Sequence, residues 1–292
     1  MSKLDSTNML NLVNTSGFPF QHNCASRIAA LNGFEVAQEV PFTFPGSNGP
    51  LLGVHGTVDI VATHRATPES DDIVCLVTEA KKANEDIKKW IFFENDQKNP
   101  KWPMFAFEKN MGNTKAVMLS RTITLPLLDY PAQSNYQYCS NAIETNSQLS
   151  AINRNQTEKV YQSLKQVAHA TRALLQMPKV IEGLNDLGGM VYNHLIFLPV
   201  VLTTAELYIP KFDKKSLVKG EIDQKDFELG PPRKWLTYDL PLPDYISYQI
   251  SRPENSIITV EKLTVFIVNA DSLEEFFEKS CEARTIEDVP QR

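Results

Sequence analysis

Two apolar segments of the chain each carry charged residues that could take part in hydrolytic chemistry. Asp59 interrupts the segment GTVDIVAT, and Glu79 and Lys81 end the segment DIVCLVTEAK. A carboxylate in an apolar segment is costly to bury unless it is paired or binds a metal ion. Two carboxylates and the backbone carbonyl of Ala80 would offer oxygen ligands, which Mg²⁺ and Mn²⁺ prefer.

These residue types suit phosphodiester hydrolysis. A metal ion held by Asp59 and Glu79 would lower the pKa of a bound water molecule and bind a phosphate oxygen. The ammonium group of Lys81 would orient that water or stabilise the negative charge that grows on the phosphate. The opposing interpretation is a structural ion pair at the strand ends, with Glu79 and Lys81 solvated on a shared face.

This chemistry depends on two strands that bring the residues together. Residues 54–63 and 73–81 are rich in branched apolar residues and flank a polar loop, which predicts an antiparallel hairpin. Alternate residues of a strand share a face. In the first strand, one face is expected to carry Thr57, Asp59 and Val61, and the opposite face Val58, Ile60 and Ala62. In the second strand, one face is expected to carry Cys75, Val77, Glu79 and Lys81.

Other elements follow from the spacing of apolar residues. Residues 17–32 and 156–176 have helical spacing and predict two helices. Residues 34–44 read as a strand. Residues 195–204 form an almost continuous apolar run, which predicts a strand buried on both faces. Pro199 within that run favours a bulge or an edge position, because proline cannot donate to a ladder.

The remaining segments are less regular. Residues 82–155 are rich in Asn, Ser and Gln and are interpreted as an insertion. Residues 210–256 are polar and contain several prolines, which predicts an extended arm or covering layer. Residues 262–268 read as a last strand and 272–281 as a last helix. This order of elements indicates a mixed α/β protein.

On these residues the chain resembles the PD-(D/E)XK nuclease superfamily, which has the restriction-endonuclease-like fold. Asp59 matches the first acidic position of the family motif, and Glu79-Ala80-Lys81 matches the (D/E)XK triplet. The preceding segment, GFPFQHNCASRIAALNGFEVAQEVPF, is similar to the opening helix and first strand of these proteins. Residues 161–166, YQSLKQ, resemble the helix after the triplet, and LIFLPVVLTT would be the next core strand.

The resemblance implies a single domain over residues 1–292, with a mixed central sheet flanked by helices. The core would comprise residues 17–81 and 157–204. Residues 82–155 would be an insertion, and residues 205–292 a C-terminal extension.

The resemblance also implies a nuclease that uses Mg²⁺ or Mn²⁺, acts on DNA rather than RNA, and serves restriction, defence or repair. Such nucleases often form homodimers. Many members carry a Glu in the opening helix as an additional ligand, and Gln21, its equivalent here, supplies no charge. The implied site consists of Asp59, Glu79 and Ala80 as metal ligands, Lys81 as the group that positions water, and Gln21 and Gln166 as lining residues.

Two alternatives stand beside the DNA nuclease. The net charge is −6 and the sequence pI about 5.5, whereas a protein whose whole surface binds nucleic acid is usually basic. Any contact with nucleic acid must therefore be local or assisted by metal ions. The acidic charge and Gln21 favour a catalytically inactive module that binds nucleic acid or a protein partner. An RNase is the other alternative.

Further patterns bear on compartment and ligands. The chain has neither a secretory signal nor an apolar run long enough to span a bilayer, and its four cysteines lie far apart, which predicts a cytoplasmic, reducing environment without a membrane partner. Cys24 and Cys75 are expected to be buried. Lysines near Trp90 and Trp102 could contact phosphates while the rings stack on bases, or could form a solvated face over a core tryptophan.

Overall fold

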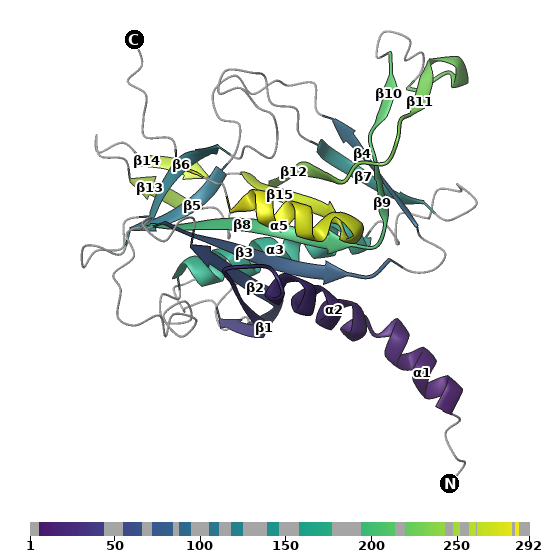
Figure 1. Ribbon diagram of the computed structural model, residues 1–292. Helices are drawn as coiled ribbons and strands as arrows, with labels where there is room; N and C mark the ends of the chain where they lie inside the picture. Colours follow the sequence, from purple (N-terminus) through teal and green to yellow (C-terminus); the bar gives the residue numbers. More distant parts are fainter. Residues whose placement is uncertain are drawn as a thin grey trace.

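A computed structural model of the chain (Figure 1) shows how these elements are arranged. It describes residues 6–43, 55–65, 72–83, 88–94, 105–110, 118–124, 139–145, 158–176, 194–213, 220–242, 248–251, 257–260, 262–281 and 284–285.

The described part of the chain is an α/β structure built on one large mixed sheet of twelve strands, with two small hairpins beside it. The main path of the sheet runs β1-β2-β3-β8-β15-β12-β7-β4-β9, and β5, β6 and β16 lie off this path. In chain order the strands are β1 (Phe34–Thr43), β2 (His55–Arg65), β3 (Asp72–Lys81), β4 (Lys89–Glu94), β5 (Phe105–Asn110), β6 (Met118–Thr124), β7 (Cys139–Thr145), β8 (His194–Thr203), β9 (Glu206–Tyr208), β10 (Pro210–Phe212), β11 (Phe227–Leu229), β12 (Trp235–Pro241), β13 (Tyr248–Ser251), β14 (Ile257–Val260), β15 (Lys262–Asn269) and β16 (Arg284–Thr285).

The first three strands form an antiparallel meander, which confirms the predicted hairpin of β2 and β3. From β3 the sheet continues in parallel through β8 to β15, and β12 then returns antiparallel to β15. Strand β8 has parallel partners on both sides, which agrees with its nearly continuous apolar sequence. The middle of the sheet is therefore its most deeply buried part.

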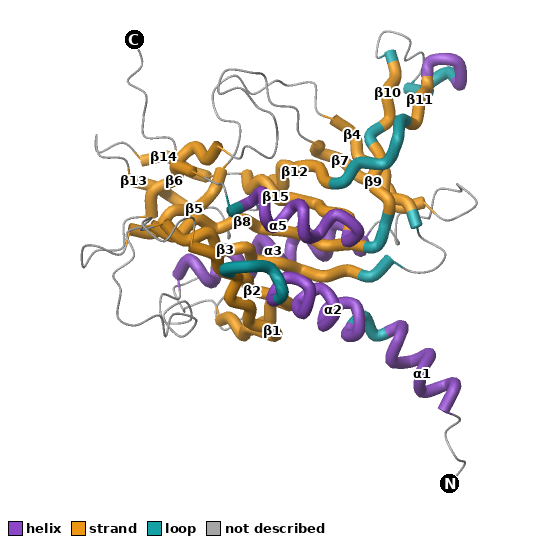
Figure 2. Tube along the Cα trace, in the orientation of Figure 1, coloured by secondary structure: helices purple, strands orange, loops and turns teal. Residues whose placement is uncertain are grey.

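Helices cover both faces of the sheet (Figures 1 and 2). The helices are α1 (Ser6–Thr15), α2 (Phe18–Ala29), α3 (Glu158–Gln176) and α5 (Leu273–Ser280). Helices α2 and α5 pack on one face with Ile28, Leu76 and Phe276 in a shared core. Helix α3 packs on the other face, where Leu164 and Val77 belong to a second core. Helix α1 extends away from the sheet beyond the start of α2 (Figure 2). None of the described helices is long and apolar enough to cross a membrane.

The described strands of the segment expected to be an insertion, residues 82–155, belong to the sheet. Strand β4 pairs with β7, β7 with β12, and β5 with β8. The core residues Trp90 and Phe92 come from β4, and both are almost fully buried. The apolar residues at alternate positions of this short strand therefore indicate a buried strand, even though the surrounding sequence is polar.

The expectation of an extended arm over residues 210–256 is wrong for residues 235–241. These residues form β12 in the middle of the sheet, and its residues from Leu236 to Leu240 are buried. Pro231 and Pro232 precede the strand and Pro241 ends it. The prolines therefore mark the limits of a strand rather than prevent one.

Strand β8 is not an edge strand, but its pairing on one side is interrupted at Pro199, where a bulge or an edge position was expected. Strand β3 pairs with β8 from His194 to Thr203 along one side. On the other side β5 pairs as far as Phe197, and β15 begins to pair at Val200. Pro199 falls in the gap between these two ladders, where a residue without an N–H group is tolerated.

Gly33, which follows α2, and Gly17, which precedes it, both have left-handed backbones, with φ of +78° and +87°. A Cβ at Gly33 would lie 2.8 Å from Nε2 of His64, whose ring packs against Phe34, whereas a Cβ at Gly17 would meet nothing within 4 Å. Gly17→Ala should cost about 1 kcal/mol through the backbone alone. Gly33→Ala should cost about 1–2 kcal/mol more, because the His64 ring must move. Urea denaturation measures both, and equal costs would contradict the proposed contact.

Candidate active site

Glu79 and Lys81 lie at the end of β3, on the face of the sheet that α3 covers. Nζ of Lys81 is 3.5 Å from Oε1 of Glu79 and 3.4 Å from Oε1 of Gln166 on α3. The Glu79 side chain is 5% exposed and that of Lys81 28% exposed. A nearly buried carboxylate therefore sits beneath an ammonium group that solvent reaches.

Asp59 reaches the same place from β2. The registered pairs of β2 and β3 end at Ile60 and Thr78. Beyond that pair, Oδ2 of Asp59 accepts a hydrogen bond of 2.8 Å from the backbone N–H of Ala80. The Asp59 side chain thus takes the place of the next ladder bond. Because the N–H and C=O of a strand residue point to the same edge, the Ala80 carbonyl is directed to the Asp59 side as well.

The predicted alternation of β2 fails at Asp59. Val58 was expected opposite Val61, but both pack in the core beneath α3, whereas Ile60 belongs to the core on the other face. The pairing of β1 with β2 is irregular at the same point, where the registered pairs skip both Asp59 and Glu39, and Glu39 has a φ of +51°. A left-handed residue within a strand turns the backbone and resets which face the following side chains occupy.

Gln21 on α2 connects these two irregular positions. Its Nε2 group donates to Oε1 of Glu39 at 2.5 Å and to the backbone carbonyl of Asp59 at 3.2 Å. The Gln21 residue is 7% exposed, and Pro19 in the first turn of α2 fixes where the helix begins. Gln21 therefore holds the backbone of Asp59 in place while the Ala80 N–H holds its carboxylate.

Glu39 is the residue that the sequence analysis missed. Its charge is close enough to contribute to the raised pKa values of both Asp59 and Glu79. Glu39 lies between the registered pairs Gln38–Ile60 and Val40–Val58, so it faces the Asp59 position of β2. Two acidic residues across one strand pair repel each other, so such a pair indicates a special local environment.

Burial and mutual repulsion raise the pKa values of Asp59 and Glu79. The pKa of Glu79 is raised from 4.5 to about 7, first by burial and then by the charge of Asp59, against the opposing effect of Lys81. Burial also raises the pKa of Asp59, although the Ala80 N–H and Lys81 act in the opposite direction. The site therefore contains negative charge that is only partly compensated by protein groups.

The donor set fits Mg²⁺ better than a metal that needs a complete protein cage. Among the residues that the structure describes, no three His, Cys, Asp or Glu side chains form a metal-binding group. Mg²⁺ commonly binds through one or two carboxylates and takes its other ligands from water and substrate phosphates. Asp59 and Glu79 supply that number, and a cation bound to both would relieve the repulsion that raises their pKa values.

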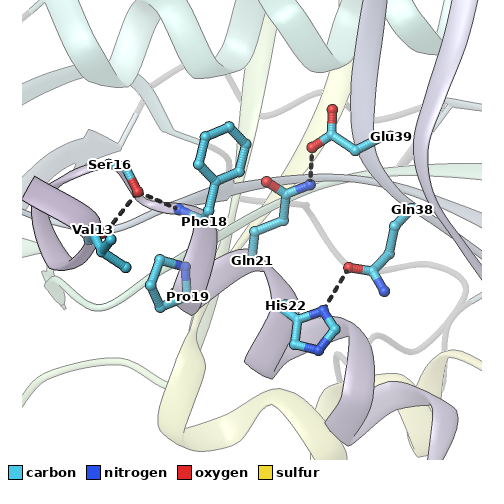
Figure 3. A pocket seen from close by; sticks show the side chains of 8 residues that line it. All are labelled: Val13, Ser16, Phe18, Pro19, Gln21, His22, Gln38 and Glu39. Carbon is cyan, nitrogen blue, oxygen red and sulfur yellow. Dashed lines mark hydrogen bonds between the residues drawn. The ribbon is translucent and has the colours of Figure 1, made fainter. Parts of the chain in front are cut away.

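An open groove of about 460 Å³ adjoins this site and shares two residues with it (Figure 3). We call it the α1–α2 groove, because it lies where α1 and α2 meet β1. His22 and Gln38 face each other in it, with Nδ1 of His22 3.3 Å from Oε1 of Gln38. The residues that line it are Val13, Ser16, Phe18, Pro19, Gln21, His22, Gln38 and Glu39.

The structure thus brings Asp59, Glu79, Ala80, Lys81, Gln21 and Gln166 into one neighbourhood, with Gln21 and Gln166 approaching from α2 and α3. Comparisons of the chain with protein-family models, with curated proteins and with solved structures find no match.

The other predicted features have simpler explanations. Cys24 and Cys75 are buried, as expected. Trp90 is 2% exposed, so it is a core residue and does not offer a face for stacking. Trp102 and the lysines next to it lie outside the described residues.

The raised pKa of Glu79 predicts how stability depends on pH. As pH rises from 4.5 to about 7, the unfolded chain loses the Glu79 proton while the folded chain keeps it, so the free energy of unfolding falls. Above about pH 7 both states are ionised, and the total loss of roughly 3 kcal/mol stays constant. Glu79→Gln should remove this loss.

Urea unfolding at pH 5 and pH 8 with chelator present measures the effect. The Glu79→Gln variant should gain roughly 2–3 kcal/mol on the wild type between the two pH values. Mg²⁺ should narrow the gap at pH 8, because it would stabilise the ionised wild-type pair. If the free energy of unfolding changes equally with pH in the wild type and the variant, Glu79 ionises with an ordinary pKa and the prediction is wrong.

Proposed function

We propose that this protein is a metal-dependent nuclease with a restriction-endonuclease-like core, and that DNA is its substrate. The observation that carries the proposal is the meeting of Asp59 and Glu79 beside Lys81 at the end of β3. Two carboxylates that repel each other next to an accessible ammonium group can serve a cation and a phosphate at the same place.

The order of elements around the site supports the fold part of the proposal. Helix α2 leads into the meander β1-β2-β3, and α3 then leads into β8, which lies parallel to β3. Helices α2 and α3 cover opposite faces of these strands. This is the order implied by the resemblance of GTVDIVAT and the Glu79-Ala80-Lys81 triplet to the nuclease superfamily.

The residues of the site would divide the work as follows. Asp59, Glu79 and the Ala80 carbonyl would hold Mg²⁺, which, when bound, supplies positive charge and lowers the pKa of water. Gln166 accepts from Nζ of Lys81 and holds the ammonium group above Glu79. From there Lys81 can donate a hydrogen bond to the attacking water or to a phosphate oxygen as its negative charge increases.

A second candidate function is a module that binds nucleic acid or a protein partner without cleaving it. It is favoured by Gln21, which occupies a helix position where a carboxylate would add a third ligand and instead donates to Glu39. Calorimetry with Mg²⁺ separates the two functions. Mg²⁺ binding that is lost in the Asp59→Asn variant favours the nuclease. A heat of Mg²⁺ titration that is the same in the variant and the wild type favours the module.

We expect Asp59→Asn and Lys81→Ala each to reduce the cleavage rate by a factor of about 10² or more, because each removes a charge that acts on the reacting phosphate. The measurement is cleavage of labelled single-stranded DNA, duplex DNA and RNA with Mg²⁺, Mn²⁺ or chelator. Lys165→Ala is the matched control, because Lys165 is an exposed lysine beside Gln166 on α3.

Circular dichroism should show that all three variants remain folded. Full activity of Asp59→Asn or Lys81→Ala, or equal loss in Lys165→Ala, would remove the basis for the catalytic assignment. Cleavage of RNA but not of DNA would support the catalytic residues and show that the substrate is RNA instead of DNA.

A further inference from the structure

Phe18 exposes an aromatic ring beside the candidate active site. It is 65% exposed, although it begins a helix whose next turns are buried in the core with Cys24 and Ile28. Phe18, Gln21 and His22 are three and four residues apart, so they share one face of α2. Figure 3 shows the Phe18 ring beside the Gln21 side chain, with Glu39 across the α1–α2 groove. The ring therefore stands next to a residue that also contacts Asp59.

The α1–α2 groove does not suit an anion. None of its eight described lining residues is Lys or Arg, and Glu39 places a carboxylate in it. A phosphate would be repelled there, whereas an uncharged planar group could stack on Phe18. The polar side chains of His22 and Gln38 lie on the exposed side of the groove and offer hydrogen-bonding groups to the edge of such a group.

Positive charge lies instead at the end of β3. Lys81 is partly exposed, and the exposed Lys82 donates from Nζ to the backbone carbonyl of Asn14 at 3.0 Å. That bond ties the end of α1 to the end of β3, so the lysines and the α1–α2 groove are neighbours. The junction is further fixed by Ser16, whose Oγ donates to the Val13 carbonyl and accepts from the Phe18 N–H.

We propose that the α1–α2 groove binds an unstacked nucleobase of the strand whose phosphate lies at Lys81, with Phe18 as the stacking surface. The proposal rests on the proposed function and names its substrate class. A base that enters the groove must leave its own stack, so single-stranded nucleic acid is preferred over duplex. A groove of about 460 Å³ has the size of ordinary small-molecule sites.

The test uses Asp59→Asn protein, which should bind without cleaving, and a fluorescent ten-nucleotide single strand, with a duplex of the same sequence for comparison. Adding Phe18→Ala should weaken binding of the single strand about 10-fold or more, because base–aromatic stacking contributes that much. Adding Phe18→Trp should keep the affinity within about threefold. The bound oligonucleotide should also quench the fluorescence of the tryptophan introduced at position 18. The Phe18→Ala substitution should change the affinity for the duplex less than the affinity for the single strand.

Leu12→Ala is the matched control, because Leu12 is 64% exposed on α1 and does not line the groove. It should leave binding unchanged. Sedimentation of the wild type, Phe18→Ala and Leu12→Ala tests the other occupant, a second copy of this chain seated on the exposed apolar residues of α1. A dimer that both substitutions dissociate would overturn the proposal.

The outcomes also separate this inference from the nuclease itself. If the wild type cleaves nucleic acid and Phe18→Ala binds and cleaves equally well, the groove proposal is wrong and the nuclease stands. If Phe18→Ala loses single-strand binding but no wild-type cleavage occurs with any metal, the groove stands and the nuclease falls. If neither single-stranded nor duplex nucleic acid binds, both are wrong.

Discussion

The hydrogen bond from the Ala80 N–H to the Asp59 carboxylate is the contact on which the site depends. It forms where the pairing of β2 and β3 ends, so a side chain completes what the backbone leaves open. The carbonyl of Asp59 is held from the other side by Gln21. A carboxylate fixed at both its side chain and its backbone would lose little further freedom on binding a cation, because that order already exists in the folded chain.

This arrangement brings acidic groups close together, and the rest of the fold must offset their repulsion. Burial and the charge of Asp59 raise the pKa of Glu79, while Lys81 compensates in part. The compensation comes from large apolar cores on both faces of the sheet, where side chains such as Leu76, Phe276 and Leu164 are fully buried. Removal of apolar surface from water stabilises the fold enough to tolerate a locally unfavourable cluster.

Local pattern predicted the elements that lie next to the site, but not how they complete it. Asp59 stands out because a charge interrupts an apolar strand, and hydrophobic spacing located β2, β3, α3 and β8. Glu39 and the face of Val58 were missed, since alternation assumes regular backbone and a φ of +51° cannot be read from residue types. The central position of β12 was missed because it depends on pairing with β15, not on its own proline-flanked sequence.

The position of β15 has a consequence for how the chain folds as it is made. On its open side β8 pairs with β5 along one part, and the rest acquires a partner only when residues 262–269 have been synthesised. Until then a growing polypeptide displays an apolar strand with unsatisfied backbone groups along part of one edge. Such an intermediate can pair with other chains. Closure of the sheet centre therefore depends on a segment that lies far from β8 along the chain.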